Sequence, residues 1–322
     1  MNDRISGAPG GKMALLVKAA RMYHEEGILQ PEIADRLGVS QSRVSRLLKE
    51  AQRLGVVRTV VISPPGLHVE LERAVREHLR LRDVVVAESA SDDDAVVLSA
   101  IGAAAAAYLE ETVRSHERIG ISSRSASLMA VVETLSPTTG RAETVVQTLG
   151  AVGNPAMRAQ ATRLADRLAE LTGAAAIYLP SPGVVTSGVV RDGLLSDPAL
   201  AEAVDAWGEL TLLLTGIGAL RSSPMRTSWG SAISNDDLAR LDGLHAVGDV
   251  CLNFFDADGN VVDGGLRDRV VGIGPEQLRA VPRRVGVAGG GLKDDAIRAA
   301  AIGGWIDVLI TDQHTARRLL EL

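Results

Sequence analysis

Residues 30–51 read QPEIADRLGVSQSRVSRLLKEA, in which small, apolar and polar residues recur at the spacing of two short helices. Ala34 stands where two helices must approach closely, and a larger side chain would push them apart. Gly38 follows four residues later, in the turn, where glycine takes a left-handed backbone conformation at little cost. Val44 then faces back toward the core. We therefore predict a helix-turn-helix.

The second helix of this pair has two unlike faces. Ser40 is placed to cap its N-terminus, and apolar residues recur on one side at Val44, Leu47, Leu48 and Ala51. The other side carries amide, hydroxyl and basic groups; Gln can pair with adenine and Arg with guanine in a major groove, and further basic groups suit phosphates. We predict these DNA-contacting residues: Gln41, Ser42, Arg43, Ser45, Arg46 and Lys49. The alternative is an ordinary solvated face of a small three-helix unit.

Charge is divided unevenly along the chain, whose net charge is −6. Residues 1–58 carry ten Lys and Arg against six Asp and Glu, whereas the remaining residues carry 24 against 34. A basic beginning suits DNA binding. The acidic remainder argues against an architectural DNA binder, which would be basic throughout.

Residue types that would indicate other classes of protein are scarce. The one cysteine, Cys251, excludes a disulfide framework and indicates a reducing cytoplasm. No stretch of 18 apolar residues is free of charge, so we expect no membrane span. The six histidines show no metal-binding spacing, and we expect no metal and no cofactor.

Composition divides the chain into successive parts. The predicted parts are a flexible tail (1–12), a helix-turn-helix domain (13–62), a Ser-Pro-Pro-Gly linker (63–66) and an effector-binding and oligomerisation domain (67–322). Within the second part we predict helices over 13–26, 31–37 and 41–54 and a strand-like run over 56–62. The last part opens with a predicted helix over 67–81, on which apolar residues recur at helical spacing.

Short apolar β runs alternate with Ala- and Leu-rich helices beyond residue 83. The predicted strands are 84–87, 118–121, 144–149, 175–179, 210–216, 250–255, 284–288 and 307–311, and helices between them include 95–109, 157–171 and 294–302. Continuous apolar strands alternating with helices indicate a mostly parallel sheet covered on both faces. The fold class is therefore α/β, with a three-helix domain in front.

Small and polar residues follow several of these strands, where an open parallel sheet collects its ligands. The predicted effector-binding residues are Gly120, Ser122, Arg124, Ser125, Gln147, Thr215, Gly216, Asp256, Gly289, Gly290 and Lys293. Lys293 and Arg124 would meet an anion, and Asp256 would accept hydrogen bonds from sugar hydroxyls. The alternative for each loop is a tight turn with no ligand. Asp92, Asp93 and Asp94 precede a helix, and we expect them to cap it and to complement its dipole.

The chain resembles the sorbitol-operon regulator (SorC) family of sugar-responsive transcription factors over nearly its whole length. The resemblance is carried by EIADRLGVSQSRVSRLLKEA at 32–51, by GDV at 248–250, FFD at 254–256, VAGG at 287–290 with Lys293, and LITD at 309–312 with Thr315 and Ala316. It implies an effector domain with the fold of ribose-phosphate isomerases, glucosamine-phosphate deaminases and CoA transferases. It also implies a phosphorylated sugar or sugar-like effector, and an oligomer, often a tetramer, on palindromic DNA.

One loop departs from the family. Where members commonly have a Ser-Trp-Gly-like turn, residues 122–126 read SSRSA. This leaves a different sugar phosphate or an unphosphorylated polyol as the effector. We predict a DNA-binding regulator of a carbohydrate-utilisation operon, not an enzyme. The alternative is a sugar-phosphate isomerase or deaminase with Asp256 as base, but no partner acid or base has a clear role.

Overall fold

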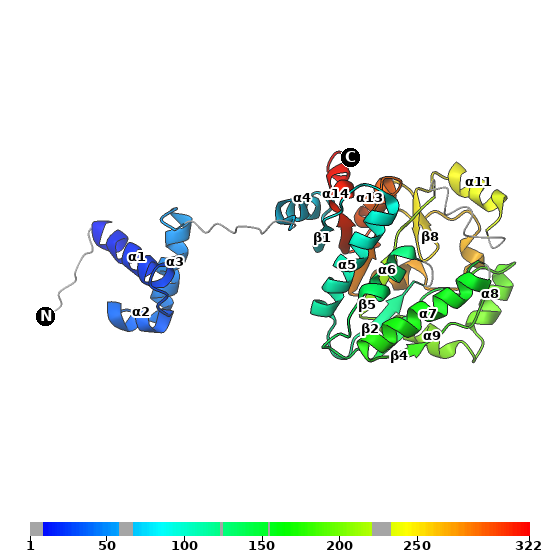
Figure 1. Ribbon diagram of the computed structural model, residues 1–322, viewed down its shortest axis with the longest axis horizontal. Helices are drawn as coiled ribbons and strands as arrows, with labels where there is room; N and C mark the ends of the chain where they lie inside the picture. Colours follow the sequence, from blue (N-terminus) through cyan, green and yellow to red (C-terminus); the bar gives the residue numbers. More distant parts are fainter. Residues whose placement is uncertain (1–8, 58–66, 123–124, 154, 221–232) are drawn as a thin grey trace. The chain divides into compact units, whose positions relative to one another are not determined.

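The computed structural model describes residues 9–57, 67–122, 125–153, 155–220 and 233–322 (Figure 1). Its chain divides into two compact units, Met1–Ile62 and Ser63–Leu322. We refer to them as the N-terminal and the C-terminal unit.

The N-terminal unit contains three described helices, α1 (Pro9–His24), α2 (Gln30–Leu37) and α3 (Gln41–Arg53). Their shared core includes Leu16, Ile33 and Val44, all fully buried. Gly38 ends α2 with φ at +64°, and its N–H bonds back to the helix, as the sequence predicts for the turn. Ser40 Oγ caps α3 by accepting a hydrogen bond from Arg43 N at 3.3 Å. The predicted helix-turn-helix is confirmed.

Two local predictions in this unit differ from the structure. Helix α1 begins at Pro9 inside the predicted tail 1–12, because proline suits the first turn of a helix and Lys12 Nζ pairs with Glu50 Oε1 at 3.0 Å. Val56 and Val57 form a bend after α3, with Val56 N bonded to Ala51 O, where the sequence predicts a strand. The rest of that run, the linker 63–66 and tail residues 1–8 lie outside the described residues.

The C-terminal unit is built on a seven-stranded sheet in which every paired neighbour is parallel, in the order β1-β10-β9-β5-β2-β3-β4. The strands are β1 (Asp83–Ala87), β2 (Arg118–Ile121), β3 (Thr144–Gln147), β4 (Ala175–Ile177), β5 (Leu212–Gly216), β9 (Arg283–Val287) and β10 (Val308–Asp312). The described helices are α4 (Val69–Leu79), α5 (Asp94–Thr112), α6 (Ala126–Thr134), α7 (Pro155–Thr172), α8 (Gly188–Leu195), α9 (Ala201–Ala206), α11 (Asn235–Gly243), α12 (Pro275–Ala280), α13 (Asp294–Ile302) and α14 (Gln313–Leu319), with 3-10 turns η1 (Trp207–Glu209) and η2 (Arg267–Arg269).

Helices cover both faces of this sheet (Figure 1). Successive strand residues point to opposite faces, so Leu212 and Leu214 pack into the core under α5, α6 and α7. Leu213 packs into the other core, with residues of α4, α12, α13 and α14. The α/β class with a mostly parallel sheet is therefore confirmed.

The predicted strand 250–255 is wrong as a member of the parallel sheet. The chain there forms a hairpin of β7 (Gly248–Val250) and β8 (Asn253–Phe255), which joins β6 (Gly218–Ala219) in a separate antiparallel sheet. Cys251 and Leu252 make the two-residue turn, with φ at +53° and +60°. The apolar run hid the turn, because neither residue type favours that conformation.

Helix α5 is long and apolar enough to cross a bilayer by length and composition alone. Its Ile101, Ala105 and Leu109 are buried in the core under the sheet, and the helix packs against α6, β1 and β10. These contacts are typical of a core helix in a folded domain. Acidic residues flank the helix at both ends.

Helix α4 opens the described part of the C-terminal unit and lies along β1, an edge of the large sheet. Glu72 Oε1 accepts a hydrogen bond from Val86 N at 3.0 Å, which pairs a main-chain donor of that edge strand. Helix α4 also packs against α14.

Candidate effector cavity and nucleic-acid interface

Helix α3 presents the polar face that the sequence predicts. Val44, Leu47, Leu48 and Ala51 are buried. The predicted DNA-contacting residues Gln41, Ser42, Arg43, Arg46 and Lys49 are exposed, and Ser45 is half-buried. Arg46 Nε donates to Ser42 O at 3.3 Å, which holds the guanidinium over the first turn of the helix. No ion pair joins Arg43, Arg46 or Lys49 to another described residue, so these charges are available to an anionic partner.

A cavity of about 490 Å³ lies at the carboxyl ends of the parallel strands in the C-terminal unit. Ser122 follows β2, Gly216 ends β5, and Gly289 follows β9. These three residues come from distant parts of the chain, and the parallel register brings them to one edge. We name this space the strand-end cavity; it occupies the place where open α/β sheets bind ligands.

The polar end of the strand-end cavity holds three charged side chains, Lys293, Asp94 and Asp249. Burial holds the pKa of Lys293 below its ordinary value, although the nearby Asp94 and Asp249 carboxylates act in the opposite direction. Within the described part of the chain the Lys293 ammonium makes no hydrogen bond and no ion pair. An ammonium in that position can bind an anionic or hydroxyl oxygen of a ligand. Three serines of the lining, Ser122, Ser125 and Ser127, add hydroxyl groups.

The β7–β8 hairpin delivers Asp249, Cys251 and Leu252 to the strand-end cavity. Asp249 Oδ2 accepts a hydrogen bond from Leu252 N at 3.0 Å across the turn. Asn253 Nδ2 donates to Val250 O and Ile273 O, both at 3.1 Å. These bonds hold two non-glycine residues at positive φ, a backbone strain of the kind found at ligand sites.

Two glycines of the lining are required by close approach. A Cβ at Gly216 would overlap Ser125 Oγ, and one at Gly289 would lie 2.5 Å from Asp312 Oδ2. Both loops therefore lie against their neighbours with backbone atoms only.

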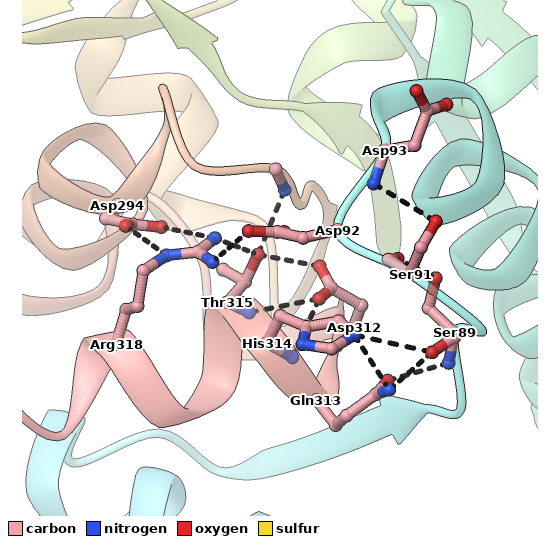
Figure 2. A network of polar contacts seen from close by, with 11 residues as sticks. Ser89, Ser91, Asp92, Asp93, Asp294, Asp312, Gln313, His314, Thr315 and Arg318 are labelled. Atoms are coloured by element: carbon pink, nitrogen blue, oxygen red, sulfur yellow. Dashed lines mark hydrogen bonds and ion pairs between the residues drawn. The ribbon is translucent and has the colours of Figure 1, made fainter.

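A network of polar contacts fixes the loops behind the charged end (Figure 2). Arg318 Nη1 bonds to Asp92 Oδ2 at 2.7 Å, and Arg318 Nε bonds to Asp294 Oδ2 at 2.6 Å. Arg318 Nη2 donates to Thr315 Oγ1 at 3.1 Å, and Thr315 Oγ1 also accepts from Gly290 N at 2.9 Å. Burial raises the pKa of Asp294 despite the opposing contact with Arg318. The guanidinium thus joins the loop before α5, the start of α13 and α14, and Thr315 of α14 in turn holds the glycine loop at Gly290.

A second part of this network ties the loop after β1 to α14 (Figure 2). Gln313 Oε1 accepts from Ser89 N at 2.7 Å, and Gln313 Nε2 donates to Ser89 O at 2.6 Å. Asp312 Oδ2 accepts from Thr315 Oγ1 at 2.6 Å and Asp312 Oδ1 accepts from His314 N at 2.9 Å, which caps α14. The loops after β1, β9 and β10 are therefore held as one assembly.

The structure brings six of the predicted effector-binding residues together. Those that line the strand-end cavity are Ser122, Ser125, Gly216, Gly289, Gly290 and Lys293. Arg124 lies outside the described residues. Gly120, Gln147, Thr215 and Asp256 are absent from the lining.

These four residues have structural contacts instead. A Cβ at Gly120 would meet Leu210 and Thr148. Gln147 Oε1 accepts from Leu179 N at 3.0 Å, and Thr215 Oγ1 donates to Gly216 O at 2.9 Å.

Asp256 organises a turn. Its Oδ1 accepts hydrogen bonds from Asp258 N at 3.0 Å and Asn260 N at 2.9 Å. Although burial raises the pKa of Asp256, the bonds from Asn260 and Asp258 hold it below its ordinary value. Its carboxylate is therefore already used by the turn after β8.

The sequence reasoning missed two carboxylates of the strand-end cavity. Asp93 caps α5 as expected, with Oδ1 accepting from Ala95 N at 3.0 Å, whereas Asp94 lines the cavity and Asp92 binds Arg318. A signal was present, since three acids in a row exceed what one cap needs. Asp249 stands in the GDV motif, but its place in the cavity lining follows from the hairpin turn, which the sequence does not predict.

A basic helix-turn-helix and a ligand cavity at strand ends define a class, the DNA-binding regulators that respond to a small molecule. Comparison with known proteins agrees. Residues 63–321 match the family model described as "Putative sugar-binding domain", and residues 20–64 match the MarR family model. The chain belongs to this family of sugar-binding regulators, which includes SorC, and it is a DNA-binding transcriptional regulator controlled by a sugar effector.

Similar proteins cover nearly the whole chain. The deoxyribonucleoside regulator of Bacillus subtilis is 29% identical over 96% of this chain and 98% of its own. The crystal structure of the full-length sorbitol operon regulator SorC from Klebsiella pneumoniae is 25% identical, with a TM-score of 0.70 over 96% of this chain and 99% of that chain. The structure described as "Putative sugar-binding domain of transcriptional regulator DeoR from Pseudomonas syringae pv. tomato" is 37% identical, with a TM-score of 0.62 over 79% of this chain and 99% of that chain.

Proposed function

We propose that the regulator binds a sugar phosphate or a related polyol in the strand-end cavity, and that this binding controls a homo-oligomer, a tetramer, on a palindromic operator in the cytoplasm. The observation that carries the proposal is Lys293, whose ammonium faces the cavity beside Asp94 and Asp249 with no hydrogen bond or ion pair to a described residue.

The chemistry of the lining supports a sugar-like ligand. An ammonium binds a phosphate or a hydroxyl oxygen, and carboxylates accept hydrogen bonds from hydroxyl groups. The main-chain N–H group of Gly289 adds a donor in the same lining as Lys293, whereas the N–H of Gly290 already bonds to Thr315 Oγ1. We propose Ser122, Ser125, Gly216, Gly289, Gly290 and Lys293 as effector contacts, with Arg124 reaching the same ligand.

Helix α3 would read the operator. We propose that Gln41, Ser42, Ser45 and Arg46 meet base edges in the major groove and that Arg43 and Lys49 meet phosphates. The effector can change operator affinity only if it binds two quaternary arrangements with different affinity.

We infer that the effector is bound and not turned over. The relatives bear the names of transcriptional regulators, and a DNA-reading helix has no purpose in a simple enzyme. Asp256, the base that an isomerase reading would use, is committed to its turn. Product formation from sugar phosphates, followed by NMR, would refute this inference.

The proposed effector binding is tested by a thermal-shift screen of sugar phosphates and polyols on the full chain. A ligand at about 100 times its Kd should stabilise the C-terminal unit by about 2.7 kcal/mol. Lys293→Met should abolish that shift. Arg317→Met is the matched control, since Arg317 is an exposed cation of α14 outside the cavity lining. An unchanged shift in Lys293→Met would remove the lysine from the site.

The proposed operator binding is tested by gel-shift titration on DNA selected from a random pool. Arg46→Ala should lower operator affinity by about 1–3 kcal/mol, because one base-edge contact is lost, and leave the effector shift intact. Arg21→Ala is the control, since Arg21 lies on α1 and pairs with Glu25. Equal operator affinity in Arg46→Ala and wild type contradicts the assignment.

A further inference from the structure

The strand-end cavity has an apolar wall in addition to its charged end. This wall is formed by Leu98 and Ile101 of α5, Met129 of α6 and Leu164 of α7. Leu98 and Met129 are half-buried, so part of each side chain faces open space, whereas Ile101 and Leu164 are buried core residues at the base of the wall. We propose that the effector is amphipathic, with a polyhydroxyl head at Lys293 and an alkyl or aryl substituent against this wall. The proposal rests on the function proposed above.

The positions along α5 separate the two ends of the ligand. Helix α5 begins at Asp94, which lies at the charged end. Leu98 and Ile101 follow four and seven residues later, about 6 and 10 Å further along the helix axis. Both still line the same cavity as Lys293. A ligand that fills the cavity must therefore reach from the carboxylates to side chains more than one helical turn away.

The wall offers hydroxyl groups nothing to bind. Leu98, Ile101, Met129 and Leu164 have neither strong donors nor acceptors, and a buried hydroxyl without a partner weakens binding. An apolar group gains from leaving water at the same place. Gln160 of α7 and Ser127 of α6 also line the cavity, but a plain sugar phosphate, which is polar on every side, would leave the four wall side chains without an apolar partner. A glycoside or a similar derivative, in which the sugar carries one apolar group, satisfies both the charged end and the wall.

The apolar wall can be tested with a probe that does not depend on the sugar. In full-length protein with 13C-labelled methionine methyl groups, 1-hexanol should shift the Met129 signal in a saturable way. Met129→Gln is nearly isosteric, and we expect it to weaken 1-hexanol binding at least tenfold when binding is followed by calorimetry. Leu98→Asn should do the same. Val96→Asn is the matched control: Val96 is exposed on the same helix and lies outside the lining.

A second arm joins the two ends of the ligand. We expect n-butyl β-D-glucopyranoside to bind the wild type at least tenfold more tightly than methyl β-D-glucopyranoside, since three further methylene groups are buried. Met129→Gln should reduce that ratio below threefold, while Val96→Asn keeps it.

The outcomes separate the two proposals. No saturable 1-hexanol binding, equal binding to Met129→Gln, or no gain from methyl to butyl would overturn the amphipathic effector. If 1-hexanol binds as described but no sugar phosphate or polyol shifts the unfolding of wild type, the proposed function fails and the apolar wall stands.

Discussion

Helix α3 and the strand-end cavity are the two candidate binding surfaces of this chain, and they are built in opposite ways. Every predicted DNA-contacting residue of α3 lies within one helix of 13 residues. The strand-end cavity takes its charged residues from Asp94, Asp249 and Lys293, which lie on a helix start, a hairpin and a loop. A site on one helix depends on helical periodicity. A site at a sheet edge depends on the order and register of distant strands.

The comparison implies that the two surfaces fail independently. Leu47→Asp should unfold the N-terminal unit, because it places a carboxylate in a core whose Val44 and Ile33 neighbours are fully buried. We expect a loss of about 4 kcal/mol, from lost apolar burial and an unpaired charge. The unfolding transition of α1–α3 should disappear from chemical denaturation curves, and operator binding should disappear from gel shifts. The thermal shift caused by the effector should remain.

Lys49→Asp is the matched control for that variant, since Lys49 is exposed on the same helix. It should reduce operator binding without unfolding the unit. If Leu47→Asp also removed the effector shift, the two units would not be independent and the comparison would fail.

The cavity, in contrast, should be sensitive to a residue outside its lining. Arg318→Gln leaves Asp92 and Asp294 without their ion pairs, and these carboxylates hold the start of α5 and the start of α13. We expect the C-terminal unit to lose about 1–3 kcal/mol of stability and the effector affinity to fall, since Asp92, which precedes Asp94, and Thr315, which binds Gly290 N, lose their contacts with the guanidinium. Thermal unfolding and calorimetry measure the two effects.

Arg317→Gln, at the neighbouring exposed arginine, should leave both measurements unchanged. Full effector affinity in Arg318→Gln would mean that the loops keep their positions without the network of Figure 2.

The smallest expected effect concerns Asp256. Its folded pKa lies below the ordinary 3.8, so its carboxylate contributes stability that is present above about pH 3.8 and is lost as the pH falls through the lowered value. Asp256→Asn should therefore reduce stability by less than about 1 kcal/mol at neutral pH. The difference from wild type should vanish in acid, and urea unfolding across this range measures it. Loss of effector binding in Asp256→Asn would return Asp256 to the ligand site.

The sequence was a reliable guide wherever the deciding contacts are local. Ser40, Gly38 and the four buried residues of α3 were assigned correctly, because caps, turns and helix faces depend on neighbours within a few residues. The parallel strands were also found, since each is a short apolar run. The hairpin at Cys251 and Leu252 was missed because the turn is held by Asp249 and Asn253 side chains.

What the sequence determined by itself is therefore the helix-turn-helix with its two faces, the α/β class, and the edge of the sheet where ligands collect. Only the tertiary structure decided which residues meet there. It placed Asp94 and Asp249 beside Lys293, withdrew Asp256 into a turn, and set an apolar wall opposite the charged end. The physical reason is that strand order and loop packing arise from contacts between residues far apart in the chain, which no local periodicity encodes.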